Sequence, residues 1–147
     1  MKWCLPLSTC ILLIACYSTP PCLTPALSEL RLRWGIQDST GTNILGYELT
    51  SRGELFRYHA TGDSLLSRIQ LGRIKGELYC RLLSQAHHAF LTVQAFYVPA
   101  DTQRFVEYRS PTALMRIVWN PRYRTHGNEL FWALYDSLET ARLCCVR

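Results

Sequence analysis

The sequence predicts an α+β domain in which one mostly antiparallel sheet is covered on one face by two helices. Short runs of alternating apolar and polar residues are separated by turn-forming residues, a pattern typical of strands with one buried face. In two later stretches the apolar residues recur at helical spacing. The order is four strands, a helix, two strands and a helix, and the short turns favour antiparallel pairing.

The first four predicted strands are joined by short turns. The first spans 30–37, where leucine, tryptophan and isoleucine alternate with arginine, glycine and glutamine. A turn-rich segment leads to the second strand at 45–49, and Gly53, expected at positive φ, closes the hairpin to the third strand at 55–58. The fourth strand, at 65–71, follows a Thr-Gly-Asp turn.

The remaining elements are two helices and a second hairpin. Apolar residues at helical spacing predict a helix over 74–88. The segments 105–108 and 114–119 are expected to pair as strands, because a Ser-Pro-Thr turn joins them. Asn128 is the expected N-cap of the last helix. The predicted core residues of that helix are Leu130, Ala133, Leu134, Leu138 and Ala141.

The first fifteen residues are typical of an export signal. Lys2 provides the positive start, residues 3–15 are largely apolar, and Ala15 is a small residue at the cut site. The apolar run is shorter than the about 20 residues that cross a bilayer. We therefore expect a signal that is removed, and no membrane span.

The residues at the cut, Leu13-Ile14-Ala15-Cys16, resemble the lipobox of bacterial lipoproteins. The resemblance implies a diacylglyceryl group on the Cys16 thiol and an acyl chain on its amine. At about 0.8 kcal/mol per buried methylene, two or three chains form a lasting membrane anchor. Tyr17 follows in place of an Asp retention signal, so we expect the periplasm-facing outer membrane where two membranes exist. Cleavage by an ordinary signal peptidase and no processing are the alternatives.

These features divide the chain into three parts. Residues 1–15 are the predicted signal, residues 16–26 are the lipidated cysteine and a proline-rich tether, and residues 27–147 form one globular domain. The element order, with Gly-Tyr-Glu-Leu at 46–49 and Phe-Val-Glu-Tyr-Arg at 105–109, resembles small uncharacterised bacterial lipoproteins. That resemblance brings no catalytic residues to carry over.

The basic residues are almost all arginines. Of 16 basic residues only Lys2 and Lys75 are lysines, and loss of residues 1–15 lowers the net charge from +5 to +4 because Lys2 leaves and no acid does. Arginines suit a surface for phosphate-rich glycolipid or anionic lipid. Their even spread along the chain favours compositional bias instead. Export makes nucleic acid an unsuitable partner.

Four cysteines remain after the signal and the anchor. They are Cys22, Cys80, Cys144 and Cys145. An oxidising compartment permits pairing. Because Cys80 lies on the first predicted helix and Cys144-Cys145 ends the last one, we expect a bridge from Cys80 to Cys144 or Cys145. Zinc binding is the alternative, but no Cys-x-x-Cys pair supports it.

The segment Gly-Asp-Ser-Leu at 62–65 matches the nucleophile block of the GDSL esterases, in which the serine attacks an ester. Such a serine needs a base held by a third group, and an oxyanion hole. The family's late Asp-x-x-His block is incomplete here, because Tyr-Arg-Thr precedes His126. We expect no catalytic residues, and a small serine hydrolase that uses Ser64 stays as the alternative.

The histidines give no metal site. His87 and His88 are adjacent on a predicted helix, so their side chains diverge by about 100° and do not share one ion as i, i+4 residues can. We expect neither a metal nor another cofactor.

The predicted contact for a partner combines aromatic and basic residues. Phe96 and Tyr97 lie in the loop before a strand, and Trp132 on the last helix can extend them into an exposed apolar patch beside Arg104 and Arg109. Core packing of this loop is the alternative. The sequence therefore favours a non-enzymatic envelope lipoprotein that binds another envelope protein or a cell-wall or lipid component. A structural or inhibitor module of the envelope is a further alternative.

Overall fold

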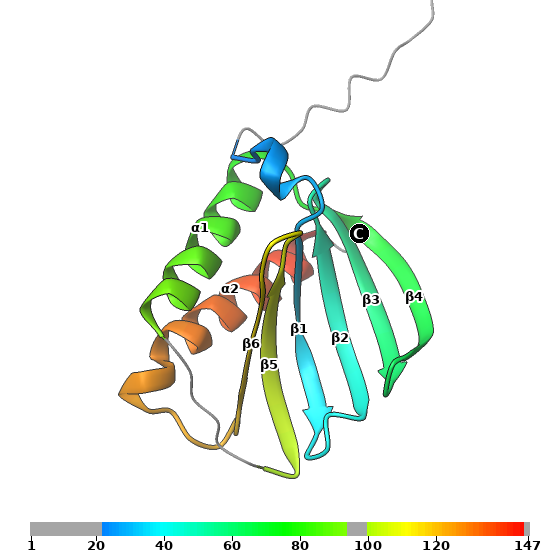
Figure 1. Ribbon diagram of the computed structural model, residues 1–147, viewed down its shortest axis with the longest axis vertical. Coiled ribbons are helices and arrows are strands. Elements are labelled where there is room, and N and C mark those ends of the chain that lie inside the picture. The colour runs from blue at the N-terminus through cyan, green and yellow to red at the C-terminus, as the bar shows by residue number, and fades with distance from the viewer. Residues whose placement is uncertain (1–21, 94–99, 146–147) are drawn as a thin grey trace, which may run out of the picture.

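Six antiparallel strands form one sheet, and two helices lie against one of its faces (Figure 1). The computed structural model describes residues 22–93 and 100–145. The sheet order is β4-β3-β2-β1-β5-β6. The elements are β1 (Arg31–Asp38), β2 (Asn43–Thr50), β3 (Glu54–Thr61), β4 (Ser64–Arg73), α1 (Gly76–Thr92), β5 (Thr102–Arg109), β6 (Leu114–Trp119) and α2 (Glu129–Cys145), with 3-10 turns at Pro25–Leu27 and His126–Asn128.

The predicted fold class is confirmed, as are the element order and the placement of both helices on one face. Each predicted strand and helix is present, with ends that differ by up to four residues. Gly53 has the predicted positive φ, at 75°. The predicted signal, residues 1–15, and the start of the tether lie outside the described residues.

The core lies between the helices and the face of the sheet that they cover. Trp34 of β1 and Trp119 of β6 are fully buried there. Phe131 of α2 packs edge-on against Phe90 of α1, with ring centroids 5.0 Å apart. The Trp34 indole also donates a hydrogen bond to Glu139 of α2, at 2.8 Å. The core therefore joins the central strand, an edge strand and both helices.

The start of α2 differs from the prediction. The 3-10 turn at 126–128 precedes the helix, and Thr125 caps that turn, while the Asn128 side chain accepts a hydrogen bond from the Thr125 N–H. Phe131 is buried and Ala133 is exposed, so the predicted core stripe was wrong in the first turn. From Leu134 onward the predicted stripe is confirmed.

The disulfide also differs from the prediction. Cys80 pairs with Cys22, with Cα atoms 5.6 Å apart, and Cys144 and Cys145 are free thiols. Leu78, Leu82 and Gln85 of α1 line the crevice beside Cys144. Because each helical residue advances about 100°, Cys80 points about 200° away from Leu82, and it meets the chain that enters the domain.

The end of α2 lies close against β4. A Cβ atom on Gly72 would lie 2.6 Å from the carbonyl oxygen of Cys145, so only glycine permits this approach. Both described helices have 17 residues, and neither is long and apolar enough to span a membrane.

Candidate functional site

The face of the sheet that the helices leave open carries a dense set of charged side chains. Strand pairing places alternate residues of β1, β2, β4, β5 and β6 on this open face. Glu54 and Arg73, which pair with each other at 3.7 Å, lie at one end of this face. The rest of the charged set is five arginines and two buried glutamates, with a net charge of +3. Its members are Arg31, Arg33, Arg68, Arg109, Arg116, Glu48 and Glu107.

Two glycines and two aromatic rings form the middle of the open face. Gly35 of β1 pairs with Gly46 of β2, and the next strands place Phe105 and Tyr58 on either side of them. A Cβ atom on Gly46 would lie 3.1 Å from the Tyr58 ring. The missing side chains therefore leave room for the rings to lie along the sheet. Phe105 is fully buried and Tyr58 nearly so, although the helices cover the other face.

Glu48 is held by two arginines. Its carboxylate accepts hydrogen bonds from Arg33 at 2.6 Å and from Arg68 at 2.7 Å, and the residue is 1% exposed. Burial alone would raise the pKa of Glu48, but the bonds from Arg68 and Arg33 outweigh it and hold the pKa below its ordinary value. This carboxylate is therefore an anion at neutral pH that fixes two guanidinium groups.

Glu107 is the second buried carboxylate, at 3% exposure. Arg116 donates to its Oε2 at 2.8 Å. Its Oε1 has no hydrogen-bond partner among the described residues. The nearest cations to Oε1 are Arg109, at 3.5 Å, and Arg33, at 3.7 Å, both beyond good hydrogen-bond range. Glu107 Oε1 is thus a buried hydrogen-bond acceptor without a donor among the described residues.

The aromatic rings of the open face are each covered by a guanidinium group. Arg68 lies 3.4 Å from the centroid of the Phe56 ring, Arg116 lies 4.3 Å from that of Phe105, and Arg33 lies 5.3 Å from that of Tyr58. These are favourable cation–π contacts. Burial raises the pKa of Tyr58 to about 12, so its hydroxyl stays protonated at neutral pH.

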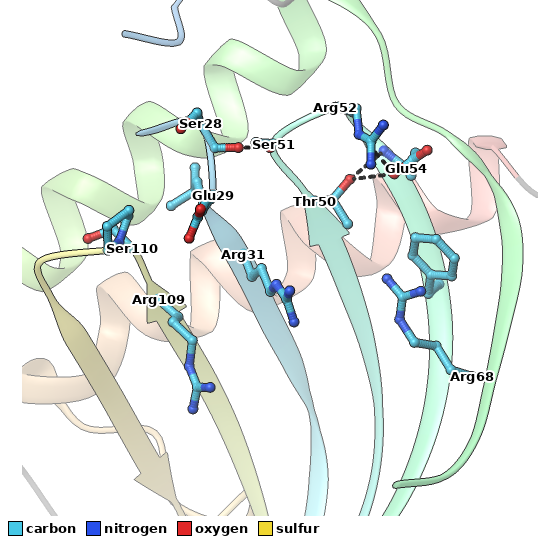
Figure 2. A pocket seen from close by; sticks show the side chains of 13 residues that line it. Ser28, Glu29, Arg31, Thr50, Ser51, Arg52, Glu54, Arg68, Arg109 and Ser110 are labelled. Atoms are coloured by element: carbon cyan, nitrogen blue, oxygen red, sulfur yellow. Dashed lines mark hydrogen bonds and ion pairs between the residues drawn. The ribbon is translucent and has the colours of Figure 1, made fainter. Parts of the chain in front are cut away.

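Arg31 and Arg109 are the least neutralised arginines of this network. They are direct cross-strand partners on β1 and β5, and both side chains extend over the open face (Figure 2). Arg31 makes no ion pair with any residue in the described ranges, and Arg109 reaches only Glu107, at 3.5 Å. Like charges directly opposite each other destabilise a sheet. The pair therefore keeps a net positive charge, because Arg31 has no ion pair among the described residues and Arg109 shares Glu107 with Arg33 and Arg116.

Two hollows lie on the open face and meet at Arg109. The first, of about 840 Å³, lies at the end of the sheet where β1 starts and β5 ends, and Arg31, Arg52 and Arg68 also line it (Figure 2). The second, of about 670 Å³, is lined by Glu107 and by the polar side chains Gln37, Thr40, Thr42 and Tyr58. Glu29 and Glu54 also line the first hollow, so its four arginines outnumber its two carboxylates, and Arg33, Arg109, Arg116 and Asp63 join the polar groups of the second. Both hollows thus have an excess of positive charge, which suits a polar anion.

The three described residues predicted for partner contact, Arg104, Arg109 and Trp132, do not form one surface. Arg104 points to the helix-covered face, where its guanidinium lies 4.5 Å from the Trp132 ring centroid and 4.6 Å from that of Tyr135. Arg109 points to the open face. Phe96 and Tyr97 lie outside the described residues. The structure thus brings Arg104 and Trp132 together as a packing contact and separates both from Arg109.

Ser64 starts the edge strand β4 and is exposed. No hydrogen bond joins it to a histidine or a carboxylate within the described ranges. His126 lies in the turn that follows β6, the opposite edge of the sheet (Figure 1). The two residues that the esterase alternative needs are therefore on opposite sides of the molecule.

The adjacent histidines diverge as expected. His87 points inward and its Nε2 lies 2.8 Å from the Tyr108 hydroxyl, whereas His88 is exposed. Across residues 22–93 and 100–145, no three His, Cys, Asp or Glu side chains cluster as metal ligands would.

No protein-family model matches the chain, and no curated protein is similar to it in sequence. The site therefore rests on its own geometry. Sequence reasoning missed Arg31, Glu48, Glu107 and Tyr58. One signal in the sequence could have indicated this site. Glutamates and arginines both occur at strand positions that period-two alternation assigns to solvent, so they could pair with one another across strands.

Proposed function

We propose that this protein is an envelope lipoprotein, held in the membrane through Cys16, whose domain binds an anionic ligand on the open face of its sheet. The paired arginines Arg31 and Arg109 carry this proposal. The two residues are cross-strand partners and line one hollow; Arg31 has no ion pair with any described residue, and Arg109 shares the single carboxylate of Glu107 with Arg33 and Arg116. Guanidinium groups bind phosphate and carboxylate in bidentate geometry, so one such group between them would remove the repulsion.

The position of this hollow supports a ligand at or near the membrane. The chain enters the domain at Cys22, and the 3-10 turn that follows lies at the end of the sheet where β1 starts (Figure 1). Six residue steps separate Cys16 from Cys22, a span of at most about 20 Å. An acylated Cys16 would therefore hold the Arg31 end of the domain close to the bilayer.

The anchor is tested by the intact mass of the protein extracted from membranes. The proposal expects a chain that starts at Cys16 and carries two or three acyl groups. An unmodified chain, or one cut elsewhere, would contradict the anchor and leave the binding site to be judged separately.

The binding site is tested with inorganic phosphate. The mature chain from residue 16, with Cys16→Ser to remove the acyl groups, keeps every described element and the disulfide. Calorimetric titration should give a dissociation constant about tenfold higher for Arg31→Gln and for Arg109→Gln than for the parent chain. Arg122→Gln is the matched control, because Arg122 is exposed and lines neither hollow. Equal phosphate affinity in all four proteins would refute the site.

A further inference from the structure

We propose that the ligand of the open face is a phosphorylated sugar. Its phosphate lies between Arg31 and Arg109, and one of its ring hydroxyls donates a hydrogen bond to Glu107. This inference rests on the proposed function and specifies what the same face binds. Its starting point is Glu107 Oε1, a buried acceptor with no hydrogen-bond partner in the part of the chain that the structure describes. A buried polar atom without a partner is costly, so a group that satisfies it gains affinity.

The surroundings of Glu107 select a neutral donor. Arg33, Arg109 and Arg116 all lie within 4 Å of its carboxylate, so an ammonium group placed there would meet three positive charges. A hydroxyl donates a hydrogen bond without adding charge. The hydroxyls of Tyr58 and Thr42 also line the second hollow, whereas the Gln37 amide is held by Gln103 and Arg116 and the Thr40 hydroxyl by Asp38. This hollow is suited to a ligand that carries hydroxyl groups.

Arg109 links the two halves of the site. It lines both hollows, it is 47% exposed, and its Nε lies 3.5 Å from Glu107 Oε1. When Arg109 turns toward a phosphate beside Arg31, it moves off Oε1 and uncovers this acceptor for the ligand. The phosphate and the hydroxyl must therefore be only a few ångströms apart in the ligand, as they are in a sugar phosphate.

The aromatic rings of the open face argue against a nucleotide. A nucleobase binds by stacking on an aromatic face. The rings of Phe56, Tyr58 and Phe105 are each already covered by a guanidinium group. The open face therefore offers phosphate and hydroxyl contacts and leaves no bare ring for a base.

The test compares glucose 6-phosphate, inorganic phosphate, glucose and adenosine monophosphate as calorimetric probes of the mature Cys16→Ser chain. We expect glucose 6-phosphate to bind about tenfold more tightly than phosphate, and glucose alone to give no measurable heat. Adenosine monophosphate should bind no better than phosphate. Equal affinity for glucose 6-phosphate and phosphate would overturn the sugar inference and leave the anion site intact. If neither glucose 6-phosphate nor phosphate binds, the proposed function fails as well. If adenosine monophosphate binds more tightly than glucose 6-phosphate, the sugar inference is wrong and the ligand is a nucleotide.

Two variants locate the hydroxyl contacts. Tyr58→Phe keeps the ring beneath Arg33 and removes only a hydroxyl, so it should reduce the preference for glucose 6-phosphate over phosphate about threefold to tenfold and leave phosphate affinity unchanged. Glu107→Gln should reduce the same preference, and its circular dichroism spectrum must match that of the parent chain. Arg31→Gln should weaken both phosphate probes by the same factor. An undiminished preference in Tyr58→Phe and in folded Glu107→Gln would refute the hydroxyl contacts.

Discussion

The Trp34 indole of β1 donates a hydrogen bond to the Glu139 carboxylate of α2 across 2.8 Å, and Trp34 has no exposed surface. Arg142, one turn further along α2, holds the other oxygen of Glu139 at 2.7 Å. The carboxylate is therefore fixed from both sides, and the helix is joined to the central strand by a directional contact in addition to apolar packing.

Replacing Glu139 should show how much this contact contributes to the free energy of unfolding. Glu139→Ala leaves the buried Trp34 N–H without an acceptor, so we expect the free energy of unfolding to fall by about 1–3 kcal/mol. Glu139→Gln keeps an acceptor and should cost less. Urea unfolding of the three proteins measures both values, and equal stabilities would show that water replaces the carboxylate at no cost.

Gly46 should not tolerate a side chain. A Cβ atom there would lie 2.7 Å from the Trp34 carbonyl oxygen and 3.1 Å from the Tyr58 ring, so we expect Gly46→Ala to cost about 1–3 kcal/mol of stability. Gly127→Ala is the matched control, because its nearest atom is 3.9 Å away and its φ is not positive. Thermal unfolding measures both, and a loss shared equally by the two variants would contradict the steric reason.

The Cys22–Cys80 bridge closes a loop with a sequence separation of 58. Loop-closure entropy predicts that the double variant Cys22→Ser/Cys80→Ser loses about 4 kcal/mol of stability. The double variant Cys144→Ser/Cys145→Ser should keep the stability of the parent chain, because both thiols are free. Unfolding curves and peptide mass mapping of the oxidised protein check both statements. A mapped link from Cys80 to Cys144 or Cys145 would restore the pairing expected from the sequence.

Removal of one member of the Arg31–Arg109 pair should stabilise the free protein. Like charges directly opposite each other in a sheet cost about 0.2–1 kcal/mol, so Arg31→Gln should raise the free energy of unfolding by that amount at low ionic strength. The gain should shrink at 1 M salt, where charges are screened within about 3 Å. Arg122→Gln again provides the control. A loss of stability in Arg31→Gln would show that the Arg31 charge is compensated.

The turn between β1 and β2 should respond to acid. Asp38 accepts a hydrogen bond from Thr40 at 2.8 Å and others from Thr42 and Asn43. The Thr40 bond is the main cause that lowers the pKa of Asp38 from 3.8 to about 2. A carboxyl whose pKa is lowered by folding stabilises the fold above its unfolded pKa, and this stability is lost as pH falls toward 2. Asp38→Ala should therefore be less stable than the parent chain at pH 6 and equally stable below pH 2, as urea unfolding at each pH would measure.

The elements of the fold could be predicted because each has its own local period. The strand at 30–37 alternates, the helix at 74–88 repeats at helical spacing, and Gly53 marks a turn that needs positive φ. The register between strands could not be predicted from local patterns. Arg31 and Arg109 become neighbours only when β5 pairs with β1, which precedes it by four other elements in the chain. The site therefore depends on long-range pairing.

The two buried glutamates show why the alternation of apolar and polar residues did not predict the site. A period of two separates the faces of a strand, and it assigns the polar face to solvent. On β2 and β5 that face is covered by arginine side chains and by the rings beneath them, so Glu48 and Glu107 are buried on the face that alternation assigns to solvent. The missed disulfide has a similar reason, since Cys22 precedes the first strand in a segment with no periodic pattern.

The Cys22–Cys80 bond also determines how the domain carries a mechanical load. Strands β1 to β4 lie between the two cysteines, inside a covalent ring that ends in α1. A pull on the chain ahead of Cys22 passes through the sulfur atoms to α1 and leaves the hydrogen bonds of β1 without tension. The four strands cannot be peeled away in sequence from that end, so force applied there must first separate α1 from the core.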